Sequence, residues 1–234
     1  MLRCTPSLLC IMLALAAGAQ AARVNLRGLS MANDEELVVG FPRPPHDQHA
    51  LMARWLVHQT SWGVLSTLDR DTGEPMGGVL SHSDGSRHDA SGRLFFYMSP
   101  MDELTQNIVA HANCTFTVSE DQIHTSTDPT TSTSSSSLPA YRPCAGLDPE
   151  EPPCARATLL GHLAPVPPAE QPRAQQALFA RHPRMADWPA DHHFTFYELH
   201  VSSLHLLSWY GGMALVEGAD YYAARPEGQP QLMR

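Results

Sequence analysis

Histidines are the most numerous candidates for metal chemistry, but their spacing matches no common metal motif. The chain has thirteen of them. His192 and His193 are adjacent, and neighbouring residues of a strand point to opposite faces. His200 and His205 are expected on different strands or at their junction. Zinc sites usually show His-x-His, His-x-x-x-His or Cys-x-x-Cys spacing, and none of these occurs. We therefore predict structural or surface histidines and no metal site.

One short segment contains all the residue types of a hydrolase triad. Ser81-His82-Ser83-Asp84 holds two serines, a histidine and an aspartate in four consecutive positions. A catalytic triad depends on side chains that converge in space, which consecutive residues cannot do, and the sequence has no Gly-x-Ser-x-Gly elbow. The segment is predicted to be a polar strand end followed by a turn.

Three cysteines lie beyond the first twenty-one residues. Pairing of Cys144 with Cys154 would close a short proline-rich loop and stabilise the fold by about 2–3 kcal/mol in an oxidising compartment. Three cysteines do not fix the connectivity, but this pair is the natural choice. Cys114 is then either a buried inert thiol or a cross-link between two copies. Asn113-Cys114-Thr115 is the one glycosylation sequon, and the sequence does not decide whether Asn113 is modified.

The N-terminus predicts entry into the secretory pathway. Arg3 precedes an apolar run at 8–17 that is too short to cross a bilayer, and Ala19-Gln20-Ala21 offers small residues for cleavage. Residues 1–21 are therefore expected to be a signal peptide, and we expect no integral membrane segment. The net charge of −9 argues against nucleic acid as a partner. The absence of lysine from the sequence excludes Schiff-base chemistry on this chain.

Short apolar segments separated by turn residues predict a mainly β protein with a few helices. After an extended leader at 22–46, Asp47 is expected to cap a helix that has Leu51, Met52, Trp55 and Leu56 on one face. Strands are predicted at 62–69, 75–82, 93–99, 113–119, 155–163, 194–200 and 204–210, the first three as a β-meander. These lengths favour an antiparallel barrel.

Two further helices complete the predicted domain at 47–224. One should begin at Ser99 as cap with Pro100 in the first turn, and the other covers 172–181. The Ser/Thr-rich stretch 124–143 is predicted to be a disordered insertion, and 225–234 a C-terminal tail. The aromatic-rich stretch 194–210 is expected to pack in the core, the alternative being a stacking platform for a ring-shaped ligand.

An ordered set of motifs over nearly the whole mature chain resembles the CREG family of secreted glycoproteins. The motifs are Trp62-Gly63-Val64-Leu65-Ser66-Thr67-Leu68, Val79-Leu80-Ser81-His82-Ser83-Asp84-Gly85, Phe96-Tyr97-Met98-Ser99-Pro100, the Cys144 and Cys154 pair, Leu178-Phe179-Ala180-Arg181-His182-Pro183, Trp188-Pro189, Tyr210-Gly211-Gly212 and Tyr221-Tyr222. The resemblance implies an antiparallel split β-barrel of the FMN-binding type, related to pyridoxamine-phosphate oxidases. It also implies a homodimer, with FMN at the dimer interface in the catalytic relatives.

The resemblance also indicates where a flavin would bind. In flavin-binding relatives, the helix after the Ser99 position carries basic residues for the phosphate, and the matching residues here are Leu104 and Gln106. Asp102 and Glu103 in the first turn would repel a phosphate. The residues left to form a degraded FMN site are Ser81, Ser99, Thr105, Gln106 and Asn107, with Arg87 or Arg93 able to reach in. We expect FMN binding to be weak or absent.

Two functional hypotheses follow. The first, which we favour, is a secreted or endolysosomal CREG-like glycoprotein that binds or signals without catalysis, either by self-association or by contact with a receptor or a glycan-binding partner. It rests on the signal sequence, the cysteine pair and the missing phosphate clamp. The second is an FMN-dependent oxidoreductase that acts on a small molecule at the dimer interface, which rests on fold-level analogy.

Overall fold

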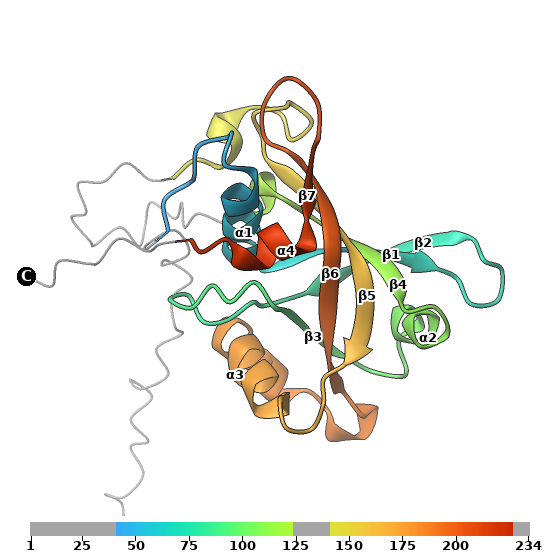
Figure 1. Ribbon diagram of the computed structural model, residues 1–234. Coiled ribbons are helices and arrows are strands. Elements are labelled where there is room, and N and C mark those ends of the chain that lie inside the picture. Colours follow the sequence, from blue (N-terminus) through green and yellow to red (C-terminus); the bar gives the residue numbers. More distant parts are fainter. Residues whose placement is uncertain (1–40, 124–140, 227–234) are drawn as a thin grey trace, which may run out of the picture. The chain divides into compact units, whose positions relative to one another are not determined.

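The computed structural model describes residues 41–123 and 141–226, which belong to one compact unit of the chain (Figure 1). The predicted signal peptide, most of the predicted leader, residues 124–140 of the Ser/Thr-rich stretch and 227–234 of the tail lie outside these ranges. Within the described residues, no helix has the length and apolarity needed to cross a membrane.

One antiparallel sheet of seven strands forms the split β-barrel (Figure 1). Its strands are β1 (Trp62–Leu68), β2 (Pro75–Ser81), β3 (Leu94–Met98), β4 (Asn113–Ser119), β5 (Arg156–Pro165), β6 (Thr195–Leu207) and β7 (Ala214–Glu217). They pair in the order β2-β1-β4-β5-β6-β3, and β7 also pairs with β6. The predicted fold class is thereby confirmed.

The predicted meander of the first three strands is wrong in its third strand. β1 and β2 form a hairpin, but β3 pairs with β6 at the other end of the sheet. After β2 the chain turns inward at Ser83, which makes a single bridge to Phe95. Turn residues predict that the chain changes direction, but they do not predict which distant strand the next strand will pair with.

The two strands predicted at 194–200 and 204–210 are one continuous strand, β6. The register with β5 shifts where Val201 faces Gly161 and Ser203 faces Leu160, which leaves Ser202 as an extra residue. Its hydroxyl donates to the carbonyl of Leu160 at 3.0 Å. This β-bulge accommodates the serines, so the strand continues where the sequence suggested a break.

Helix α1 (His49–Gln59) packs into the main core, and every residue from position 52 to 59 is buried. Met52, Trp55 and Leu56 are buried as predicted, whereas Leu51 is half-buried. The predicted cap at Asp47 is wrong, because the helix begins after Gln48 and no side chain caps it. The leader is partly inside the fold, since Phe41 is buried and its carbonyl accepts a hydrogen bond from the Trp55 indole at 2.9 Å.

Helix α2 (Glu103–Ala110) begins later than predicted. Asp102, and not Ser99, is its cap, and the Asp102 carboxylate accepts a hydrogen bond from the Thr105 backbone at 3.1 Å. Helices α3 (Gln171–Arg181) and α4 (Gly218–Ala223) follow β5 and β7. α3 packs on β3 around Phe95 and Leu178 and forms a second apolar cluster, beside the main core of the barrel (Figure 1).

The cysteines are arranged as the sequence suggested. Cys144 and Cys154 form a disulfide, and Cys114 is a buried free thiol. The expected insertion ends earlier than residue 143, because Tyr141 packs edge-on against Trp55 and its hydroxyl hydrogen-bonds to Glu120.

Candidate functional site

Three side chains of the expected flavin site, those of Ser99, Thr105 and Gln106, lie around the N-terminus of α2, and each has a partner within the chain. The Ser99 hydroxyl is almost buried and donates to the carbonyl of His192 at 2.7 Å. The Thr105 hydroxyl donates to the Asp102 carboxylate at 3.3 Å. The Gln106 amide donates to the carbonyl of Pro100 at 2.9 Å. A phosphate would have to compete with each of these contacts.

The remaining residues of that set point elsewhere. Asn107 is fully buried, and its side-chain oxygen accepts a hydrogen bond from the backbone of Arg70 at 3.0 Å. Ser81 is half-buried at the end of β2, where its backbone pairs with Trp62. Arg93, considered as a phosphate ligand, binds Glu198 at 2.6 Å and Glu170 at 2.8 Å. The structure therefore does not gather these side chains around one point.

Position 104 cannot present a side chain to a phosphate at all. Leu104 is buried in the main core, and its side chain lies against Gly78 of β2. The first turn of α2 carries the two carboxylates of Asp102 and Glu103. These negative charges occupy the positive end of the helix, where an anion would otherwise be favoured.

An apolar cavity of about 540 Å³ lies beside Ser99 and the start of α2. Aromatic rings form part of its wall. Tyr97 stacks on Phe194 and on Trp188, with ring centroids 4.9 Å and 5.9 Å apart. The lining residues are Leu80, Tyr97, Met98, Ser99, Met101, Asp102, Trp188, Pro189, His192 and Phe194. Asp102 is the carboxylate in this lining, so the cavity suits an apolar ring better than a phosphate.

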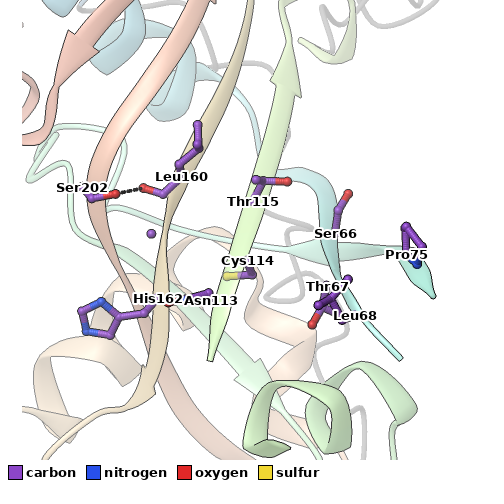
Figure 2. Close-up of a pocket in the computed structure, with 11 residues that line it drawn as sticks. Ser66, Thr67, Leu68, Pro75, Asn113, Cys114, Thr115, Leu160, His162 and Ser202 are labelled. Carbon is purple, nitrogen blue, oxygen red and sulfur yellow. Dashed lines mark hydrogen bonds between the residues drawn. The ribbon is translucent and has the colours of Figure 1, made fainter. Parts of the chain in front are cut away.

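A second cavity, of about 620 Å³, is a groove on the outer face of the sheet (Figure 2). Figure 2 shows side chains from β1, β4, β5 and β6 around it, with His162 and Asn113 on one side. Its lining residues are Ser66, Thr67, Leu68, Pro75, Asn113, Cys114, Thr115, Leu160, Gly161, His162 and Ser202. Burial raises the pKa of the Cys114 thiol to about 11, so at neutral pH it is protonated and a poor nucleophile.

The triad-like segment forms a buried structural network. His82, Ser83 and Asp84 are almost completely buried, which the prediction of a polar turn missed. Asp84 accepts a hydrogen bond at 2.7 Å from His58. The Ser83 hydroxyl lies within hydrogen-bond distance of the carbonyls of Gly85 and Ala177, at 2.9 and 2.7 Å, so its single proton is directed to the backbone and not to an imidazole. His58 lies 26 positions before Asp84, and no local motif could have joined the two.

The sequence also missed a pair of exposed histidines. His162 of β5 and His200 of β6 face each other across the strands, with ring centroids 4.8 Å apart and planes 21° apart. His192 and His193 lie before the strand, where His192 ends a 3-10 turn and His193 has a left-handed backbone with φ 53°. Among the described residues, no three His, Cys, Asp or Glu side chains are placed to hold one metal ion.

Comparison with known proteins points to a single family. A family model described as "CREG, beta-barrel" matches residues 44–223. Mouse Protein CREG2 is 34% identical over 181 residues, which cover 76% of this chain and 57% of that protein. Human Protein CREG1 is 32% identical, and the match covers 77% of this chain and 76% of that protein. This chain therefore spans little more than half the length of mouse CREG2.

The fold likeness extends to bacterial proteins. A structure titled as a heme binding protein from Mycobacterium smegmatis matches with a TM-score of 0.56 and 21% identity, covering 79% of this chain and 62% of that one. A protein of unknown function from Agrobacterium tumefaciens matches with a TM-score of 0.53 and 20% identity, covering 77% of this chain and 63% of that one. At this identity the likeness concerns the fold alone. The family match over most of the described residues, together with the split barrel, establishes that this chain belongs to the CREG family.

Proposed function

We propose that this chain is a non-catalytic binding or signalling glycoprotein that uses a flavin-type split barrel as a scaffold. The observation that carries the proposal is the state of the phosphate end of the expected flavin site. Ser99, Thr105 and Gln106 are hydrogen-bonded within the chain, Leu104 is buried, and the start of α2 carries carboxylates. A doubly charged phosphate would meet repulsion there, and α2 carries no basic side chain to offset it.

The proposed place of action is the secretory pathway, either outside the cell or in an endolysosomal compartment. The apolar run at 8–17 and the small residues before position 22 support a cleaved signal, and the disulfide fits an oxidising environment. Asn113 is exposed at the rim of the outer groove, which supports its glycosylation. Removal of N-linked glycans should lower the mass of the secreted chain, and should leave Asn113→Gln unchanged.

We further propose that two copies of the chain associate. The outer face of the sheet offers a broad surface with the exposed apolar side chains of Leu68 and Val79, next to the groove. Sedimentation or size-exclusion mass of the secreted chain tests this. Val79→Glu should shift the mass towards the monomer if this face is the contact, and Val109→Glu, which changes an exposed apolar residue on α2, should not.

Turnover measurements test the absence of catalysis. The purified mature chain is mixed with FMN and a reduced nicotinamide, and oxidation is followed against free FMN alone. We expect no rate above free FMN, because the carboxylates of Asp102 and Glu103 disfavour the flavin phosphate at the start of α2. A rate proportional to protein concentration would contradict the proposal.

An FMN-dependent oxidoreductase is the second candidate, and the aromatic cavity is the observation that favours it. Tyr97, Trp188 and Phe194 could stack against a flat ring, and the cavity volume of about 540 Å³ lies within the range of small-molecule sites. This candidate requires that Ser81→Ala, Ser99→Ala or Thr105→Ala weaken flavin binding. Equal affinity in all three variants would remove it.

A further inference from the structure

His162 and His200 are held opposite each other by two paired strands. His162 precedes the buried Leu163, and His200 lies between the buried Leu199 and Val201, so both imidazoles point to the outer face. Their ring centroids are 4.8 Å apart and their planes differ by 21°. Within the described residues, neither ring is hydrogen-bonded to another protein group, and both residues are exposed. Their nitrogen lone pairs are therefore open to solvent.

The strand geometry brings the two imidazoles within reach of one ion. A divalent late transition metal binds an imidazole nitrogen at about 2.0–2.1 Å, so two nitrogens on one metal lie roughly 3.3 Å apart. Rings whose centroids are 4.8 Å apart reach that spacing by side-chain rotation alone. The two strands approach closely here, because a Cβ on Gly161 would lie 2.1 Å from the carbonyl oxygen of His200. The backbones that carry the two histidines are therefore already fixed relative to each other. Two ligands on paired strands therefore need little ordering on binding.

We propose that His162 and His200 form an open two-imidazole site for a divalent late transition-metal ion. Imidazole suits copper, nickel and zinc, and the Irving–Williams order places Cu²⁺ first. Water occupies the other coordination positions, because among the described residues no third His, Cys, Asp or Glu completes a metal cluster. The groove beside His162, with the polar side chains of Asn113 and Ser202, leaves room for that water (Figure 2). This site is independent of the flavin question, but it shares the outer face with the proposed contact between copies, and the proposed glycan residue Asn113 pairs with His162.

Nearby charges leave the site accessible to a cation. Glu198 precedes His200 by two residues on β6 and is bound to Arg93 at 2.6 Å; Arg93 also binds Glu170 at 2.8 Å, so this cluster carries one more negative than positive charge and does not repel a cation. Glu198 is thus engaged and is not counted as a ligand. The metal is held by the two imidazoles alone, which predicts micromolar and not structural affinity.

The test is a Cu²⁺ titration of the untagged mature chain by calorimetry, with electron paramagnetic resonance of the loaded protein. The wild-type chain should bind one Cu²⁺ at this site, with hyperfine structure from two nitrogens. His162→Ala and His200→Ala should each weaken binding at least tenfold and leave a one-nitrogen spectrum. Thermal unfolding of each variant in the absence of metal confirms that it is folded.

His205→Ala is the matched control. His205 is exposed on the same strand, but it faces Thr158 on β5 and Leu215 on β7 in place of a second histidine. The His205→Ala variant should bind Cu²⁺ with the same affinity and stoichiometry as the wild type. A second control changes His192 and His193 together, because an adjacent pair could bind copper independently.

The proposal is overturned if His162→Ala and His200→Ala bind Cu²⁺ as the wild type does, or if the wild-type spectrum shows a single nitrogen. Loss of binding in the His192 and His193 double variant, with none in His162→Ala, would place the copper elsewhere and would also overturn it.

Discussion

At the scale of single residues, buried ionisable groups make the stability of this fold depend on pH. His82 is completely buried at the end of β2, and its ring donates to the carbonyl of Val57 at 3.0 Å. Burial lowers the pKa of His82 to about 4, assisted by the charge of Arg181 and opposed by the Val57 hydrogen bond. Burial also lowers the pKa of His182, whose ring donates to the carbonyl of His82. Both imidazoles are therefore neutral in the folded chain at pH 7.

This arrangement predicts a loss of stability in mild acid. An unfolded histidine takes up a proton near pH 6.5, whereas folded His82 resists protonation until about pH 4. Its contribution is therefore complete above pH 6.5, and roughly 3 kcal/mol disappears as the pH falls from 6.5 to 4. His82→Gln keeps a donor for Val57 and removes the titration. Denaturant unfolding at pH 7 and pH 4.5 should show a smaller difference in this variant than in the wild type; an equal difference would mean that His82 is not the group responsible.

Asp84 predicts a dependence of the same sign at lower pH. Its burial would raise the pKa of its carboxyl, but the charge and hydrogen bond of His58, with Arg181 and the Gly92 backbone, outweigh burial and hold the pKa below its usual range. The stabilisation by the Asp84 carboxylate is present above the ordinary pKa of 3.8 and is lost as the pH falls through the lower folded value.

Asp84→Asn should therefore lower the free energy of unfolding by about 3–5 kcal/mol at pH 7, because His58 keeps a buried ring without its charged partner. The difference from the wild type should shrink only in strong acid. Asp71→Asn is the exposed control and should change stability by less than about 0.5 kcal/mol. Equal stability of Asp84→Asn and wild type at pH 7 would refute the assigned role.

At the scale of elements, the sequence predicted what is local and missed what is distant. The β4 strand agrees with its predicted range because Cys114, Phe116 and Val118 alternate with polar residues. The partner of β3 could not be predicted, since strand pairing depends on which segments meet in three dimensions. The cap of α2 was misplaced by three residues because Ser99 and Asp102 both fit a start signal, and the Ser99 hydroxyl donates to the carbonyl of His192.

The pairing of β5 with β6 gives an element-scale prediction. A Cβ on Gly161 would lie 2.1 Å from the carbonyl oxygen of His200, so Gly161→Ala must push the two strands apart. We expect a loss of about 2–3 kcal/mol in the free energy of unfolding. Gly77→Ala is the control on β2, where a Cβ would lie 3.5 Å from Val64, an ordinary contact. The midpoint of thermal unfolding should be clearly lower for Gly161→Ala than for Gly77→Ala. Equal midpoints would contradict this interpretation of the register shift.

At the scale of the whole molecule, the split barrel and the CREG family were predictable, whereas the groupings of the candidate sites were not. The ordered motifs gave the family, and the family match over residues 44–223 confirms it. The flavin residues could be named from the resemblance, but their hydrogen bonds to His192, Asp102 and Pro100 appear only in three dimensions. The cross-strand pair of His162 and His200 was invisible for the same reason, because 38 positions separate them in the sequence.

We propose that this barrel does not hold a flavin phosphate. An equilibrium titration of the folded mature chain with FMN, followed by flavin fluorescence, tests it most directly, with riboflavin as the ligand that lacks the phosphate. We expect no saturable FMN binding in the micromolar range and no advantage of FMN over riboflavin, because Asp102 and Glu103 repel the phosphate. Saturable micromolar binding of FMN, tighter than that of riboflavin, would show a working phosphate site and would overturn the proposal.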